Sequence, residues 1–505
     1  MSAAETKTLK AKLEDLQCHF TWNLDATASK LLRISEHLID IGSDEGNTWL
    51  GQIYNLLGYI HFKLGNNDEA GEFFTKSEEA LLKTKQGDQG PWMAVNYANQ
   101  AWLRHHQGEE EEAQVYLSKI DALMKEYPTP SQDELHPEIY GEKAWTLLKF
   151  GKTQKVLALD LFKKAIEIKP DVVEWQSSYF IGFTNTHKHS REGLPAAKME
   201  EIREAMEQDP ENLYLAAVYL KARAERGEHV EEEARELATK ILGNPVSCYS
   251  GLKVILRVYR TYDLIDEAIA LAEEALENHA EERYLKRCAA LCYQWKLKFS
   301  RNGRPTQRMI ERAMALHKDV IVLYPHSSFV KKMDLATVYA KTGDVRRAEE
   351  IYKDLLRGDL EPEDRQVLYN SYAKFLNFDR NDRDRSVDYH MMAAEIHHES
   401  FFRQNSISAL EKIRDRGRNR RGREIAEFLE NLEQEGFVST PTLTLTPTTR
   451  TRTHTHTQLL QHYCSVPHTH THTHTQLLEH YCSVPELQQI PYIYIYINTY
   501  IHSHN

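Results

Sequence analysis

The feature that most constrains the fold of this chain is a helical pattern with a glycine turn at its centre. The segment YNLLGYIHFKLGNNDEAGEFF begins at Tyr54 and carries the small residues Gly58 and Ala70, a glycine at Gly65, and Phe74 one helical turn after Ala70. Glycine at the end of a helix permits a tight turn into the next one. Small residues let paired helices approach closely, and large residues fill the space between them. The segment therefore predicts a helix, a turn and a second helix.

The same pattern recurs along the chain. YANQAWLRHHQGEEEEAQVYL carries Gly108 and Ala113, and LATVYAKTGDVRRAEEIYKDLL carries Gly343 and Ala348 at matching offsets. VILRVYRTYDLIDEAIALAEEAL, from Val254, predicts a further helix pair. This order of helix, turn and helix is that of the tetratricopeptide repeat. We therefore predict an all-α fold, an α-solenoid of tetratricopeptide repeats.

The spacing of the repeats predicts several subdomains. Gly65, Gly108 and Gly151 are separated by more than the roughly 34 residues of a standard repeat, so additional helices or linkers must lie between the early units. We predict an N-terminal repeat subdomain at 1–240, a middle and C-terminal repeat region with basic helices at 241–436, and a low-complexity tail at 437–505.

The tail differs in composition from the rest of the chain. THTHTQLLQHYCSVP at 453–467 returns at 471–485 with one change, Gln461 to Glu479. Alternating Thr and His is the translation of a CA dinucleotide repeat, and YIYIYI is that of a TA repeat. We interpret the tail as disordered, translated repeat DNA and assign it no function, although histidine-rich tracts can also bind metal.

Composition favours a cytosolic protein without metal or cofactor. The chain has 505 residues, a net charge of -12 and six cysteines, and neither a signal peptide nor a membrane-spanning run is recognisable. So few cysteines indicate free thiols in a reducing compartment. Cys288 and Cys292 would share a helix face, but no second pair of ligands follows at a spacing typical of zinc sites.

The sequence offers little support for catalysis. It has no GxxxxGK[ST] phosphate loop, no HExxH and no GxSxG. Cys18 and His19 are adjacent, but neighbouring side chains on a helix point in different directions and cannot form a thiol–imidazole pair by themselves. We predict that the chain is not an enzyme, and a hydrolase using Cys18 and His19 is a remaining alternative.

Basic residues are concentrated in one part of this acidic chain. From Arg283 to Arg308 there are eight Lys or Arg and no Asp or Glu. Just upstream, Lys253, Arg257 and Arg260 would share a helix face. Cations interleaved with aromatics, on repeats that curve around a surface, suit a phosphate backbone or 5′ phosphates. The alternative is a solvated face that pairs with glutamates, and the basic run at 412–423 is equally open to both interpretations.

Several motifs together resemble one family. CHFTW at 18–22, YNLLGYIHFKLG from Tyr54, EKAWTLLKFGK from Glu142 and the VYR at 258–260 are similar to the interferon-induced proteins with tetratricopeptide repeats, the IFIT family. The resemblance extends from about residue 9 to about residue 400. It implies a cytoplasmic antiviral effector that binds single-stranded RNA by its 5′ end in a basic channel and favours a triphosphate or an incompletely methylated cap.

The resemblance also implies a set of site residues. The ring of Trp145 would stack on a cap or terminal base, and the Lys149 ammonium would meet a phosphate. The predicted RNA-binding residues are Arg33, His37, Trp145, Lys149, Lys253, Arg257, Tyr259, Arg260, Lys286 and Arg287.

The sequence departs from the family pattern at several of these places. Asn185 stands where the family has an arginine, and Lys155 lies near the place of a tyrosine. Lys286, Arg287 and Cys288 align with His-His-Gln. Loss of an arginine's bidentate donor would weaken triphosphate selectivity.

The predicted partners are the 5′ ends of single-stranded RNA, and also other tetratricopeptide family members or host proteins, without a membrane. The alternative function is a protein-interaction scaffold in the interferon response that does not bind RNA.

Overall fold

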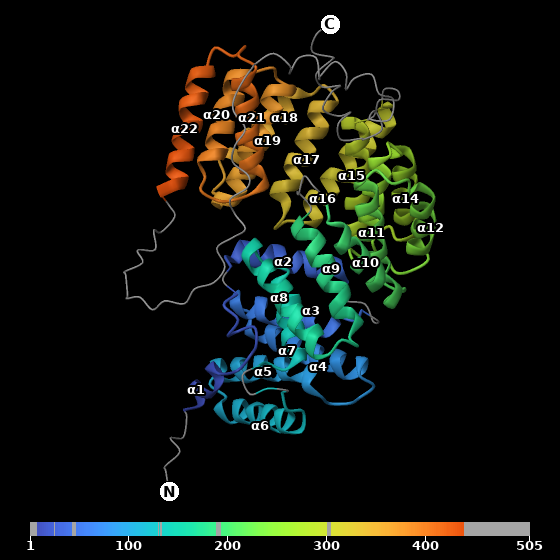
Figure 1. Ribbon diagram of the computed structural model, residues 1–505, viewed down its shortest axis with the longest axis vertical. Coiled ribbons are helices and arrows are strands. Elements are labelled where there is room, and N and C mark those ends of the chain that lie inside the picture. Colours follow the sequence, from blue (N-terminus) through green and yellow to red (C-terminus); the bar gives the residue numbers. More distant parts are fainter. Residues whose placement is uncertain are drawn as a thin grey trace, which may run out of the picture. The chain divides into compact units, whose positions relative to one another are not determined.

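The computed structural model describes residues 8–24, 26–42, 47–129, 131, 134–187, 193–299 and 305–438 (Figure 1). Every regular element among these residues is a helix, which confirms the predicted all-α class. The chain divides into two compact units, of which the first runs to Asp359 and the second begins at Leu360, with Phe378–Arg380 assigned to the first. The predicted tail lies outside the described residues from position 439 onward.

The first unit contains α1 to α18. Their bounds are α1 Leu9–Glu14, α2 Ala28–Ile41, α3 Leu50–Lys63, α4 Asn67–Thr84, the short 3-10 helix η1 Pro91–Met93, α5 Ala94–Gln107, α6 Glu110–Glu126, α7 Pro137–Leu147, α8 Lys152–Ile168, α9 Val173–His187, α10 Ala196–Gln208, α11 Leu213–Glu225, α12 Glu231–Leu242, α13 Leu252–Thr261, α14 Ile265–Asn278, α15 Arg283–Phe299, α16 Gln307–Leu323, α17 Ser328–Lys341 and α18 Val345–Leu356. The second unit contains α19 Pro362–Phe378, α20 Arg383–Glu395, α21 Phe401–Asp415 and α22 Gly422–Val438.

Consecutive helices pack as pairs, as the repeat pattern predicts: α3 with α4, α5 with α6 and α17 with α18. Gly65 lies between α3 and α4 with φ 88°, and Gly108 between α5 and α6 with φ 82°. These backbone angles favour glycine because a side chain is strained there. Gly151 differs, since it precedes α8 with an ordinary φ of -72°.

Close approach within a pair is clearest at Gly58 on α3. A Cβ added there would lie 2.6 Å from the Phe74 ring and 3.1 Å from the Ala70 carbonyl oxygen, both on α4. Ala70 and Phe74 are fully buried. The small and large residues of the repeat therefore have the roles that the sequence predicts.

Two large hydrophobic cores fill the first unit. One is built from buried residues between Cys18 and Leu215, and the other from residues between Ala217 and Val338. The two sets meet within α11. The domain boundaries at 240 and 436 stay predictions.

Cys18 and His19 lie in the first core and are completely buried. His19 Nδ1 lies 3.3 Å from Asn99 Oδ1, and His19 Nε2 lies 3.3 Å from Thr146 Oγ1. Burial raises the pKa of the Cys18 thiol to about 12 and lowers the pKa of His19 to about 3, so both groups are neutral. Neither group is accessible to a substrate, and this removes the basis of the hydrolase alternative.

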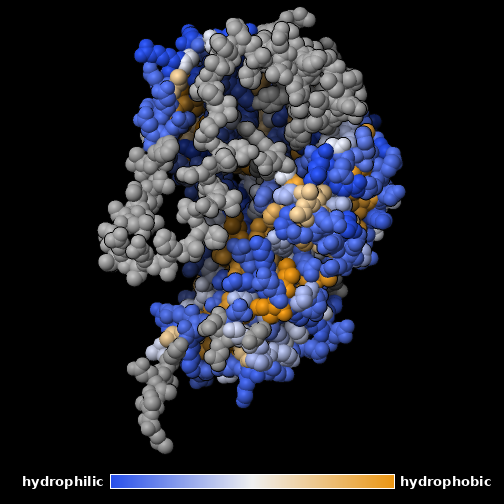
Figure 2. Space-filling model, in the orientation of Figure 1, coloured by the Kyte–Doolittle hydropathy of each residue, from blue (hydrophilic) through white to orange (hydrophobic). Residues whose placement is uncertain are grey.

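One face of the molecule is mostly polar where the structure describes it (Figure 2). The face shown in Figure 2 is largely hydrophilic, with smaller hydrophobic areas between the helices. Among the described helices, none is both long and apolar enough to span a bilayer.

Candidate functional site

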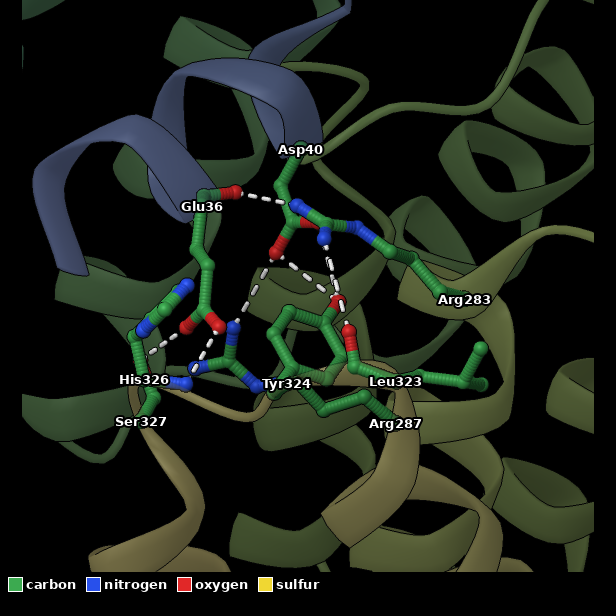
Figure 3. A network of polar contacts seen from close by, with 8 residues as sticks. All are labelled: Glu36, Asp40, Arg283, Arg287, Leu323, Tyr324, His326 and Ser327. Carbon is green, nitrogen blue, oxygen red and sulfur yellow. Dashed lines mark hydrogen bonds and ion pairs between the residues drawn. The ribbon is translucent and has the colours of Figure 1, made fainter. Parts of the chain in front are cut away.

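Helix α2 is tied to residues far along the chain by two buried carboxylates (Figure 3). Asp40 accepts hydrogen bonds from Arg283 Nε at 2.9 Å and Arg287 Nη1 at 3.3 Å, both on α15, and from the Tyr324 hydroxyl at 2.9 Å. One turn earlier, Glu36 accepts from the Ser327 hydroxyl at 2.5 Å. We call these contacts the α2 anchor.

Burial explains why the anchor has so many donors. Asp40 is 4% exposed and Glu36 is 5% exposed. A buried carboxylate is tolerated only when cations or hydrogen-bond donors replace its water. Further donors to Glu36 are the His326 backbone N–H, at 2.8 Å from its carboxylate, and Arg283, which reaches its backbone carbonyl. The anchor therefore fixes α2 against α15 and the start of α17.

The anchored α2 brings His37 to a group of basic side chains. The positive charges that lower the pKa of His37 belong to Lys149, Lys155, Lys253 and Arg287. Arg257 and Lys331 are among the charges that lower the pKa of Lys253. We call these six basic residues the cation cluster. They come from the turn after α7, from α8, α13, α15 and α17, so several repeats contribute basic residues to the cluster.

Lys149 is held between aromatic rings. Its ammonium donates to the Tyr249 hydroxyl at 2.7 Å and lies 3.9 Å from the centre of the Trp145 ring. Among the described residues, no carboxylate lies within ion-pair distance of it. Burial, with a further contribution from Lys155, lowers the pKa of Lys149 to about 7.

Lys253 has a similar environment on α13. Burial is the main cause that lowers its pKa to about 7, and Arg287 and Arg257 lower it further. Lys331 on α17 is 8% exposed, and burial followed by Arg287 lowers its pKa to about 8. Cations that are desolvated and repel one another are stabilised when an anion enters.

Solvent reaches part of the cluster. The side chains of Lys149, Lys253, Arg257 and Arg287 are half-buried, and that of His37 is exposed. The surrounding protein and the nearby cations nevertheless lower the pKa of His37 to about 3, so its imidazole is neutral and can accept or donate a hydrogen bond. This arrangement can bind a multiply charged anion.

Trp145 lies directly beside the cluster, but its ring has no open face. It is 1% exposed and stacks on Trp49, with ring centres 5.4 Å apart and planes inclined by 15°. Lys149 covers the ring as well. The predicted stacking of Trp145 on a base stays a prediction, and it requires one of these neighbours to move.

The other predicted residues lie apart from the contacts that define the cluster. The Arg260 guanidinium lies 4.9 Å from the centre of the Trp295 ring. Tyr259 is 4% exposed and lies near Glu267 on α14 and Arg235 on α12. Arg33 and Lys286 are half-buried. Their roles in RNA binding stay predictions, and the structure does not bring Tyr259 to the cluster.

Several neighbours of the cluster were not predicted. Lys331 is buried in the cluster, whereas the next residue, Lys332, is exposed. No spacing pattern in the sequence indicates which of the two lysines belongs to the cluster. The Tyr249 ring stacks on Tyr214, with ring centres 5.5 Å apart. Asn185 lies near the Tyr214 hydroxyl.

The second basic run lies in the other unit and is largely paired with acids. Arg420 contacts Asp384, Arg421 contacts Asp388 at 2.6 Å, and Arg423 contacts Glu427 at 2.8 Å. This pairing favours a solvated helix end. Within the described residues, no group of His, Cys, Asp and Glu is arranged to hold a metal ion.

Comparisons with known proteins agree with this architecture. A family model for the tetratricopeptide repeat matches residues 49–125. The antiviral innate immune response effector IFIT1 of Homo sapiens is 27% identical over 85% of this chain and 91% of its own length. The IFIT1 of Macaca fascicularis is 27% identical over 80% of this chain and 87% of its own length. The chain is a homologue of the IFIT proteins.

Solved IFIT structures share the fold. An IFIT1 monomeric mutant with Gppp-AAAA matches with a TM-score of 0.65 at 25% identity, covering 85% of this chain and 99% of that one. The human IFIT1 dimer with PPP-AAAA matches with a TM-score of 0.64 at 25% identity, covering 85% of this chain and 96% of that one. The predicted tetratricopeptide solenoid and the predicted IFIT resemblance are confirmed.

Proposed function

We propose that this IFIT homologue is a cytoplasmic antiviral effector of innate immunity. It binds the 5′ end of foreign single-stranded RNA, at a triphosphate or an incompletely methylated cap, and withholds that RNA from translation without catalysing a reaction. The cation cluster is the binding site, and 5′ phosphates are the anions that it accepts.

One observation carries the proposal. Lys149 and Lys253 are half-buried and have no carboxylate within ion-pair distance among the described residues. Desolvated ammonium groups without counter-charges are unfavourable in a folded protein unless a ligand supplies the charge. A chain of phosphates offers several negative charges along one line, which suits basic groups contributed by successive repeats.

The likeness to IFIT1 supports the choice of ligand. IFIT1 is named as an antiviral effector, and its solved structures hold PPP-AAAA and m7Gppp-AAAA. The scaffold alternative would be favoured by an acidic or apolar enclosed surface. The surface described here is basic, and this supports RNA as the ligand.

A binding assay with matched RNAs tests the proposal. One sequence is prepared with a 5′ triphosphate, a monophosphate, a hydroxyl or a cap, and its affinity is measured by fluorescence anisotropy over a salt series. We expect tighter binding of phosphorylated ends. We also expect the logarithm of the affinity to fall linearly with the logarithm of the salt concentration, because phosphate binding releases counterions. Absence of binding at low salt, or equal binding of phosphorylated and hydroxyl ends, would contradict the proposal.

A further inference from the structure

The environment of Trp145 bears on which 5′ end the site accepts. A cap adds a purine base beyond the phosphates, and proteins bind an isolated base by stacking it on an open aromatic face. The centre of the Trp145 ring lies 3.9 Å from the ammonium of Lys149, a member of the cation cluster. A ring that is 1% exposed cannot receive a base.

Trp49 covers the Trp145 ring and is fixed in place. Its own side chain is 8% exposed and belongs to the first hydrophobic core. Its backbone N–H donates to Asn47 Oδ1 at 3.0 Å, and the Asn47 amide donates to the Gly42 carbonyl at 2.9 Å. These bonds hold Trp49 at the start of α3, where its ring lies nearly parallel to that of Trp145.

Lys149 is the second cover. The Tyr249 hydroxyl holds its ammonium at 2.7 Å, which keeps the ammonium 3.9 Å from the Trp145 ring centre. The two covers favour different ligands. An ammonium attracts phosphate oxygens, whereas an incoming base would have to displace either the cation–π contact or the Trp49 ring.

We propose that Trp49 is a specificity-determining residue that makes this site select uncapped, 5′-triphosphate RNA over capped RNA. Trp49 occupies the aromatic face that a cap base would need, and Lys149 presents a charge to the terminal phosphates. The inference rests on the proposed function, since it concerns which 5′ ends enter the same site.

Competition between two RNA ends tests the proposal. RNAs of one sequence with triphosphate, Gppp or m7Gppp ends are titrated against the wild-type chain and against W49A and W49L. W49L keeps much of the apolar volume of the core, so it decides the question if W49A does not fold. W92L is the matched control, because Trp92 packs against the same core and has no ring contact with Trp145 among the described residues.

We expect the wild-type chain to bind triphosphate RNA at least about tenfold more tightly than either capped RNA, a difference of about 1.4 kcal/mol. W49L should narrow that gap by binding capped RNA more tightly, and W92L should leave the gap unchanged. Equal wild-type affinities for triphosphate and capped RNA would overturn the proposal, as would a W49L variant that gains no affinity for capped RNA or loses triphosphate binding. If the wild-type chain binds none of the RNAs, the proposed function itself fails.

Discussion

Replacing Asp40 by asparagine should release helix α2. The Asp40 side chain is 1% exposed and faces two guanidinium groups and the Tyr324 hydroxyl. Asparagine has nearly the same shape and keeps one oxygen acceptor, but it removes the negative charge. Arg283 and Arg287 then share a half-buried position without a counter-charge.

The expected cost follows from the burial of this pair. Removing one partner of a buried ion pair destabilises a protein by about 3–5 kcal/mol. Because asparagine retains one acceptor, we expect D40N to lower the free energy of unfolding by about 3 kcal/mol, the lower end of this range. Asp354 supplies the control, because it pairs with Arg357 at 2.7 Å and both side chains are exposed, at 71% and 75%. For D354N we expect at most about 1 kcal/mol, since solvent screens exposed pairs.

Hydrogen exchange read by mass spectrometry measures both effects locally, which avoids treating a two-unit chain as a single transition. For D40N, we expect protection of α2 amides to fall roughly 100-fold, because each 1.4 kcal/mol corresponds to about a factor of ten. The same peptides should be unaffected in D354N. A loss of protection below about fivefold in D40N would refute the view that Asp40 anchors α2.

Three further predictions concern charge and packing. The pKa values of Lys149 and Lys253 are about 7, and bound phosphate favours their charged forms. Affinity for triphosphate RNA should therefore fall as pH rises above about 7. A variant with both lysines replaced by arginine should show a weaker dependence of affinity on pH, because arginine stays charged. Burial raises the pKa of Glu142 from 4.5 to about 8, so the unfolded chain releases this proton first and stability falls as pH rises between those values. Urea unfolding should therefore show E142Q to be more stable than wild type at about pH 8, with a smaller difference near pH 5; a constant difference would contradict this. G58A should lower the free energy of unfolding in urea by about 1–3 kcal/mol through its clash with Phe74, whereas G71A, whose nearest contact is 3.6 Å away, should be neutral or slightly stabilising.

Local features of the fold were predictable from the sequence. Gly65, Gly108 and Gly343 end helices with positive φ, and Gly58 faces Phe74, because these roles depend on residues close together in the chain. The basic residues Lys253 and Arg257 were also found correctly as neighbours, since they lie one helical turn apart.

Contacts between distant segments were not predictable. Asp40 and Arg283 are 243 positions apart, and no local pattern indicates that one neutralises the other. Tyr259 was grouped with Arg257 because both are on one helix, but residues two positions apart face opposite sides of a helix. The covering of Trp145 by Trp49 likewise depends on how α3 packs beside α7, and the motif AWTLLK contains no signal for it.

Charge reversal in the cation cluster tests whether this cluster binds the 5′ phosphates of RNA. K253E places a carboxylate among Arg257, Arg287 and Lys331, whereas K240E makes the same change at an exposed position on α12. Affinity for a 5′-triphosphate RNA is measured at low salt for both variants, with circular dichroism to confirm helical content. We expect a loss of roughly 100-fold or more for K253E and a change within about twofold for K240E. Equal affinities of K253E and the wild-type chain would contradict this expectation.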